Sequence, residues 1–227
     1  ESRNPEELLE ILFLINRLIK FSSTSDISRG RIDQKLKMFQ NKIIPVLRGL
    51  RLGNGRLVRA NGCGGEITNW NLDKELYDAK PLDFSTRKNP MDFYRVSAGR
   101  LKIIFNGKSK TIKKQSKEYS CPGLSFEVTS GQRTIFQNNS PFLSFLGHSD
   151  NIFKLERQYN SVGFSKKTNR SKASSWSSEI IEMQNYRDLK NYYIFGKKKI
   201  LVDQEGIIHS RKLTIPFSGT EIYGKDV

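Results

Sequence analysis

The sequence predicts an α+β fold in which two N-terminal helices precede a β-rich body of antiparallel hairpins with one further helix. Two observations favour this class. Apolar residues recur at helical spacing before Pro45, whereas the alternation typical of strands dominates from Phe93 onward. We therefore expect a helical segment at residues 1–48 and a β-rich body at 49–227. A single domain over residues 1–227 is the alternative, because one domain can reach this size.

The first helix is expected from Pro5 to about Phe21. Asn4 can cap it, proline suits its first position, and Glu7 completes a capping box. Apolar residues cover most of its circumference between residues 8 and 19, which predicts burial on several sides or docking to a protein partner. Polar residues interrupt this stretch, which is shorter than the roughly 20 residues of a transmembrane helix.

The second helix is expected from Arg29 to about Ile44, and Pro45 should kink or end it there. It carries a narrow apolar stripe opposite a cationic face. Such a helix can bind a polyanion, lie on a membrane or expose a solvated face. The stripe consists of Ile32, Leu36, Phe39 and Ile43.

The remaining chain suggests short elements joined by turns. Leu50 to Arg59 should form a hairpin that turns at Asn54-Gly55. A short helix is expected near Leu72 to Tyr77, and a further one at Glu179 to Leu189, capped by Ser177 or Ser178. A turn at Asn106-Gly107 should join the second and third expected strands. These strands are Phe93–Val96, Leu101–Phe105, Thr111–Lys114, Leu124–Val128, Thr134–Gln137, Phe142–Leu146, Ile152–Leu155, Tyr192–Phe195, Lys199–Val202 and Gly206–Leu213.

Positive charge is the strongest functional clue. The chain has 39 Lys and Arg against 23 Asp and Glu, a formal net charge of +16. Seven of these basic residues and no acidic one lie between Arg100 and Lys117. Such an excess attracts polyanions at long range. Nucleic acid or an acidic membrane surface is therefore the expected class of partner.

Three local clusters combine cations for phosphates with flat side chains that could stack on bases. Each alone also fits an ordinary solvated surface beside core aromatics, such as Phe105. No zinc-finger spacing, no RNP1-like run and no GXXG clamp flanked by helices occurs, so we expect backbone-led binding that prefers single-stranded RNA. The candidate nucleic-acid-binding residues are Arg100, Lys102, Lys108, Lys110, Lys113 and Lys114; then Lys166, Lys167, Arg170, Lys172 and Trp176; and finally Tyr192, Tyr193, Lys197, Lys198 and Lys199.

Residues suited to catalysis or to metal binding are sparse. The two histidines and two cysteines are not at ligand spacing, so we expect no metal and no cofactor. One nuclease-like pattern exists: an acid, a spacer and a lysine at Asp188 to Lys190, which together with an upstream carboxylate such as Asp150 or Glu182 could hold Mg²⁺ and polarise a phosphate. A solvated turn explains the same residues. Whether the protein is an enzyme stays open, and a binding protein without catalytic activity is favoured.

We therefore expect a non-enzymatic, RNA-preferring nucleic-acid-binding protein, a module of a viral or organellar assembly. No signal peptide or transmembrane segment is visible, which favours an intracellular site. One alternative is a peripheral membrane or matrix-type structural protein that uses the same lysines against acidic lipid, and an exposed apolar face on the first helix would favour it. The other is a small metal-dependent nuclease, which clustered carboxylates in a cleft would favour.

Overall fold

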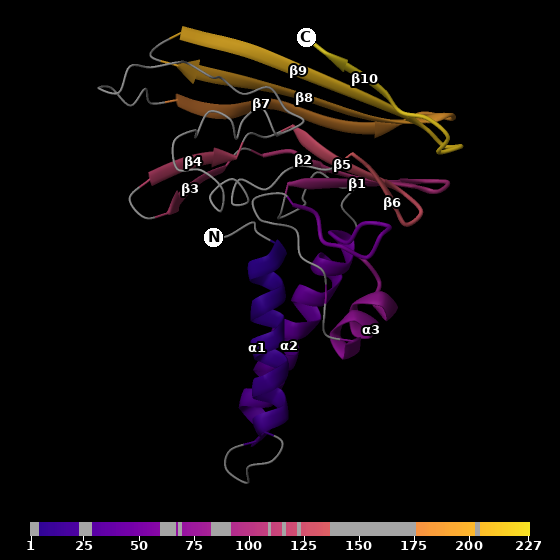
Figure 1. Cartoon of the computed structure of the whole chain (residues 1–227). Helices are drawn as coiled ribbons and strands as arrows, with labels where there is room; N and C mark the ends of the chain where they lie inside the picture. The colour runs from indigo at the N-terminus through magenta and orange to yellow at the C-terminus, as the bar shows by residue number, and fades with distance from the viewer. Residues whose placement is uncertain are drawn as a thin grey trace.

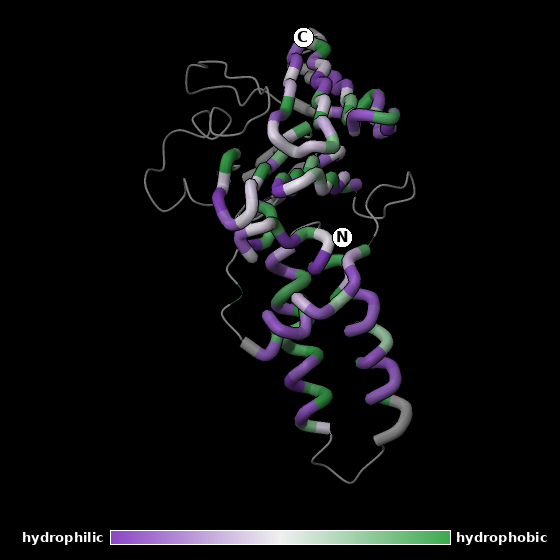
Figure 2. Tube along the Cα trace, turned by 90° about the vertical axis from the view of Figure 1, so that its right-hand side faces the viewer, coloured by the Kyte–Doolittle hydropathy of each residue, from purple (hydrophilic) through white to green (hydrophobic). Residues whose placement is uncertain are grey.

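The computed structural model describes residues 5–22, 29–59, 67, 70–82, 92–108, 110–114, 117–121, 124–136, 176–202 and 205–227. It confirms the α+β class and arranges the described elements in layers (Figure 1). A helical layer lies against one face of an N-terminal sheet, and a C-terminal sheet lies against the other face. Figure 2 shows the same succession from the side. The expected strands at 142–146 and 152–155 lie outside the described residues.

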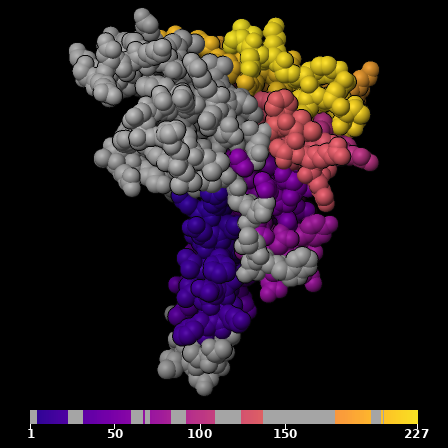
Figure 3. Space-filling view, viewed as in Figure 1, coloured from indigo at the N-terminus to yellow at the C-terminus, as the bar shows by residue number. Residues whose placement is uncertain are grey.

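The helices α1 (Pro5–Ser22) and α2 (Arg29–Gly49) form an antiparallel hairpin that projects from the sheets (Figure 1; Figure 3). Leu12 and Ile15 are buried in it. The short helix α3 (Trp70–Asp78), predicted near Leu72 to Tyr77, packs at the base of the hairpin. Burial of α1 on several sides is wrong, however, because one of its faces leaves large apolar side chains exposed.

Helix α2 continues past Ile44 to Gly49, so Pro45 lies inside it. The burial of Leu47 and Leu50, both fully inaccessible, outweighs the local preference of proline for a helix end. The predicted turn at Asn54-Gly55 is confirmed. The amide of Val58 donates to the carbonyl of Leu50 (3.0 Å) across it, and Gly55 has the positive φ of 84° that favours glycine.

The N-terminal sheet is antiparallel, with the order β1-β2-β5-β6. Its strands are β1 (Phe93–Ala98), β2 (Leu101–Asn106), β5 (Ser125–Ser130) and β6 (Arg133–Phe136). The strands β3 (Lys110–Lys114) and β4 (Lys117–Cys121) pair only with each other. The expected hairpin through Asn106-Gly107 is therefore wrong, because β1 and β5 occupy both edges of β2.

The C-terminal sheet is also antiparallel, with the order β10-β9-β8-β7. Its strands are β7 (Trp176–Arg187), β8 (Asn191–Val202), β9 (Glu205–Pro216) and β10 (Tyr223–Asp226). The helix expected at Glu179 to Leu189 is thus wrong. A β-bulge leaves Ile181 unpaired between Ile180 and Glu182, so the alternation is broken. The long pairing of β7 with β8 overrides the local cap signal.

The main core lies between the two sheets. Ile103, Phe105 and Val128 from the N-terminal sheet meet Ile194, Leu213 and Ile215 from the C-terminal sheet. A second core, which includes Leu50, Val58 and Ile104, joins the opposite face of the N-terminal sheet to the helical layer. The C-terminal sheet consequently has one face toward the core and one that faces away from both other layers. That outward face is the candidate site.

Candidate nucleic-acid interface

The register of the C-terminal sheet aligns aromatic residues across its outward face. Successive side chains of a strand alternate between faces, and directly opposed residues share a face. Ile194 and Leu213 point into the core, so their strand neighbours point outward. One outward row across the four strands consists of Tyr223, Thr214, Tyr193 and Tyr186.

Basic residues flank this row. The adjacent row consists of Lys225, Lys212, Phe195 and Gln184, and the rows beyond it place Lys197 and Lys199 on β8. We define the tyrosine-lysine face by its aromatic and basic members: Tyr186, Tyr193, Phe195, Lys197, Lys199, Lys212, Tyr223 and Lys225.

The rings of Tyr186 and Tyr193 form a stacked pair on this face. Their centroids are 4.7 Å apart and their planes are inclined by 17°. The ammonium of Lys212 lies 5.2 Å from the centroid of the Tyr193 ring, within the range of a cation–π interaction. Tyr186 is 49 % exposed and Tyr223 is 56 % exposed. The face therefore presents accessible π surfaces beside a cation.

The turn between β7 and β8 fixes the position of Tyr193. One carboxylate oxygen of Asp188 accepts hydrogen bonds from the amides of Lys190 and Asn191, both at 2.7 Å. The other accepts one from the hydroxyl of Tyr193, also at 2.7 Å. These bonds, led by that from the Lys190 amide, lower the pKa of Asp188 to about 2. The bond to Asp188 raises the pKa of Tyr193, which stays protonated as the donor.

These contacts place Asp188 and Lys190 in a turn, as the alternative interpretation of this pair predicted. Both oxygens of Asp188 already accept hydrogen bonds, and Glu182 accepts one from Gln184 at 2.6 Å. Asp150 lies outside the described residues. Within the part of the chain that the structure describes, no three His, Cys, Asp or Glu residues are grouped to hold a metal ion.

Charge on the face is unevenly compensated. Lys197 lies opposite Glu182 and Lys199 lies opposite Glu179, so these pairs partly neutralise each other. Lys212 has different cross-strand neighbours, Phe195 and Lys225. Lys212 and Lys225 therefore have no acidic cross-strand neighbour, whereas the carboxylates of Glu221 and Asp188 hydrogen-bond to the side chains of Tyr223 and Tyr193 in the row.

The third predicted cluster, Tyr192, Tyr193 and Lys197 to Lys199, is divided between the two faces of β8, because successive side chains of a strand point to opposite faces. Tyr193, Lys197 and Lys199 point outward, as a binding role requires. Lys198 is 0 % exposed and lies on the core face, so its inclusion among the binding residues is wrong. Tyr192 also belongs to that face and packs against the main core. A run of adjacent residues in a strand cannot form one surface cluster.

The first predicted cluster lies elsewhere and is divided as well. Arg100 is exposed in the turn between β1 and β2, whereas Lys102 faces the helical layer. Lys108 is exposed and lies 3.4 Å from a carboxylate oxygen of Asp92. Phe105 is fully buried, so it cannot stack on a base.

The remaining predicted residues fall into two groups: the structure describes the backbone of some of them and no part of the others. Lys110, Lys113 and Lys114 lie on β3 and Trp176 begins β7, but their side chains are outside the described part. Lys166, Lys167, Arg170 and Lys172 lie outside the described residues altogether.

Sequence reasoning missed Tyr186, Lys212, Tyr223 and Lys225. The sequence contains a signal for Tyr186, since the residues from Asp188 to Asn191 are typical of a turn. A hairpin with this turn aligns Tyr186 with Tyr193. The other three come from strands whose register only the tertiary structure fixes.

Comparison with known proteins finds no match among family models, curated proteins or solved structures. Among the helices of the described residues, none has the length and apolar content to cross a membrane.

Proposed function

We propose that this protein binds single-stranded nucleic acid, with RNA preferred, through the tyrosine-lysine face. The observation that carries the proposal is the row of tyrosines across the sheet beside a row that contains Lys212 and Lys225. Bases stack on exposed aromatic rings at roughly 1 to 3 kcal/mol each, while lysines neutralise phosphates. The net charge of +16 adds long-range attraction.

Backbone-led recognition fits the chemistry of this face. Stacking and phosphate contacts tolerate any base, because every base has a π surface and every nucleotide carries a phosphate. RNA is preferred in the proposal because proteins usually recognise it through unpaired bases. A duplex would offer no exposed base faces to the tyrosines.

The test compares two exposed aromatic rings. Tyr186→Ala removes a ring from the face, and Phe39→Ala removes an exposed ring from α2 as the control. Titration of a labelled single-stranded RNA should show affinity about 5- to 150-fold weaker for Tyr186→Ala and nearly unchanged for Phe39→Ala. Equal affinities for the two folded variants would refute the proposal.

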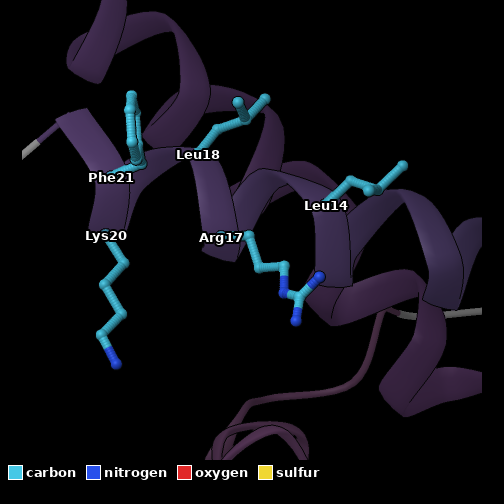
Figure 4. A pocket seen from close by; sticks show the side chains of 5 residues that line it. All are labelled: Leu14, Arg17, Leu18, Lys20 and Phe21. Carbon is cyan, nitrogen blue, oxygen red and sulfur yellow. The ribbon is translucent and has the colours of Figure 1, made fainter.

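A second candidate function, attachment to an acidic membrane surface, is favoured by the exposed side of α1. Ile11, Leu14, Leu18 and Phe21 follow a three-four-three spacing and form one stripe; Leu14 is 57 % exposed and Phe21 is 74 % exposed. In Figure 4, Leu14, Leu18 and Phe21 point to one side, and Arg17 and Lys20 point to another. This division suits a helix in a membrane interface.

Vesicle co-sedimentation separates this candidate from the first. Membrane attachment predicts binding to vesicles that contain phosphatidylserine and loss of binding in Leu14→Gln/Leu18→Gln. The same variant should keep its RNA affinity if the tyrosine-lysine face binds RNA. No sedimentation of the wild type would reject the membrane candidate and leave the stripe as a surface for a protein partner.

A further inference from the structure

A separate group of cations lies on the face of the N-terminal sheet that points toward the helices. Lys102 on β2 opposes Ser97 on β1, and Arg95 lies two residues before Ser97, so all three share one face. Ile104, on the same face, packs with Leu50. Arg48 lies in the last turn of α2, between Val46 and Leu50, which both pack against this face of the sheet.

These cations are close enough to repel each other. The pKa of Arg95 is lowered by burial and by the charge of Arg48. The pKa of Lys102 is lowered by burial and then by Arg95, Arg48 and Arg51. Repulsion of this kind destabilises the folded state unless an anion compensates it.

Two acidic residues lie near these cations. Asp73 pairs with Arg51. Glu127 lies opposite Ile104 on the same face of the sheet, and its Oε1 accepts a hydrogen bond from the amide of Arg59 (2.6 Å), which engages one of its two oxygens. Among the described residues, no carboxylate forms an ion pair with Arg48, Arg95 or Lys102.

Two polar atoms of the group are also unsatisfied. The Nε atoms of Arg48 and Arg95 are buried, and no described residue accepts a hydrogen bond from them. The guanidinium of Arg48 instead lies 5.5 Å from the centroid of the Tyr77 ring. Buried donors without partners are rare in native proteins, so each requires an explanation.

We propose that Arg48, Arg95 and Lys102 form a binding site for a single phosphate group. The planar forks of two arginines suit phosphate oxygens, and a lysine supplies a third positive charge. The exposed Ser97, opposite Lys102, adds a hydroxyl on the same face. This site is separated from the tyrosine-lysine face by the main core and stands independently of the function proposed for that face.

The first experiment measures thermal unfolding of the full chain in inorganic phosphate and in chloride at equal ionic strength and pH 7. Phosphate should raise the Tm of the wild type, because a ligand that binds only the folded state stabilises it. Lys102→Gln should raise the Tm in chloride, because it relieves repulsion, and should abolish most of the shift in phosphate. Lys35→Gln, which removes the same charge from an exposed position on α2 outside both proposed sites, should keep the shift.

A phosphate group can come from a free phosphorylated molecule or from a nucleic-acid backbone, and a second experiment distinguishes them. If the backbone supplies it, Lys102→Gln should bind single-stranded RNA about tenfold more weakly than the wild type. If a free molecule supplies it, RNA affinity should stay unchanged while the phosphate shift is lost.

Two results would contradict the proposal of a phosphate site. One is a wild-type Tm that is equal in phosphate and chloride. The other is a phosphate shift that is equal in the wild type and in both folded variants, Lys102→Gln and Arg95→Gln. Failure of the proposed RNA binding would leave these readouts intact, since inorganic phosphate needs no base to stack.

Discussion

Replacing the four lysines of the tyrosine-lysine face by glutamine should reduce the salt dependence of RNA binding. Each phosphate neutralised on a single strand adds about 0.7 to the slope of log affinity against log salt. Four full contacts would contribute about 2.8, or roughly 50-fold in affinity between about 50 and 200 mM salt. Lys197 and Lys199 lie opposite Glu182 and Glu179, so the smallest expected contribution to the slope comes from Lys212 and Lys225 alone. That contribution is about 1.4, or roughly sevenfold in affinity over the same salt range.

The assay is fluorescence anisotropy of a labelled single-stranded RNA at several salt concentrations. The matched control replaces Lys108, Lys110, Lys113 and Lys114 by glutamine and so removes the same charge from the region around β3. Circular dichroism should show both variants folded, since exposed lysines contribute little to stability. Equal losses of slope would mean that net charge alone drives binding, and a larger loss in the control would move the interface to the β3 region.

Three further predictions concern the fold. Because the pKa of Asp188 is lowered in the folded state, its carboxylate stabilises the fold above about pH 3.8, and this stabilisation is lost as the pH falls through about 2. Denaturant titrations at several pH values should show this contribution to the free energy of unfolding in the wild type and not in Asp188→Asn. Phe105→Ala should lower the free energy of unfolding by about 3 to 5 kcal/mol in urea titrations, because the ring is fully buried between the sheets; a loss under about 1 kcal/mol would contradict that packing. Gly219→Ala should lower the Tm more than Gly131→Ala. A Cβ at Gly219 would lie 1.8 Å from the carbonyl oxygen of Ala98, whereas a Cβ at Gly131 would have no atom within 4 Å. Equal decreases in Tm would show that the positive φ of both glycines alone determines the destabilisation.

The helical part and the strands of the body could be largely predicted because they depend on local patterns. Pro5 and Glu7 mark the start of α1, and the apolar spacing defines α2. Pro45 was misleading because its effect depends on tertiary burial of Leu47 and Leu50, which no local rule contains. The segment from Glu179 was misleading for a similar reason, since the bulge at Ile181 hides the alternation of a strand.

The candidate site could be predicted only in part. The run from Tyr192 to Lys199 contains four of its residues, but alternation along the strand places Lys198 on the core face and Lys199 on the outward face. Tyr223 reaches the same row from a strand near the other end of the sheet order, which no spacing in the sequence encodes. The cations that surround Lys102 likewise come from α2 and β1, and their meeting depends on how the helices pack.

The most direct test of the central proposal is photochemical crosslinking of single-stranded RNA to the full chain, with the adducts mapped by mass spectrometry. The proposal predicts adducts at Tyr186, Tyr193 or Tyr223 that disappear at high salt. Adducts found only in peptides outside β7–β10, or RNA affinity that is flat in salt, would contradict it.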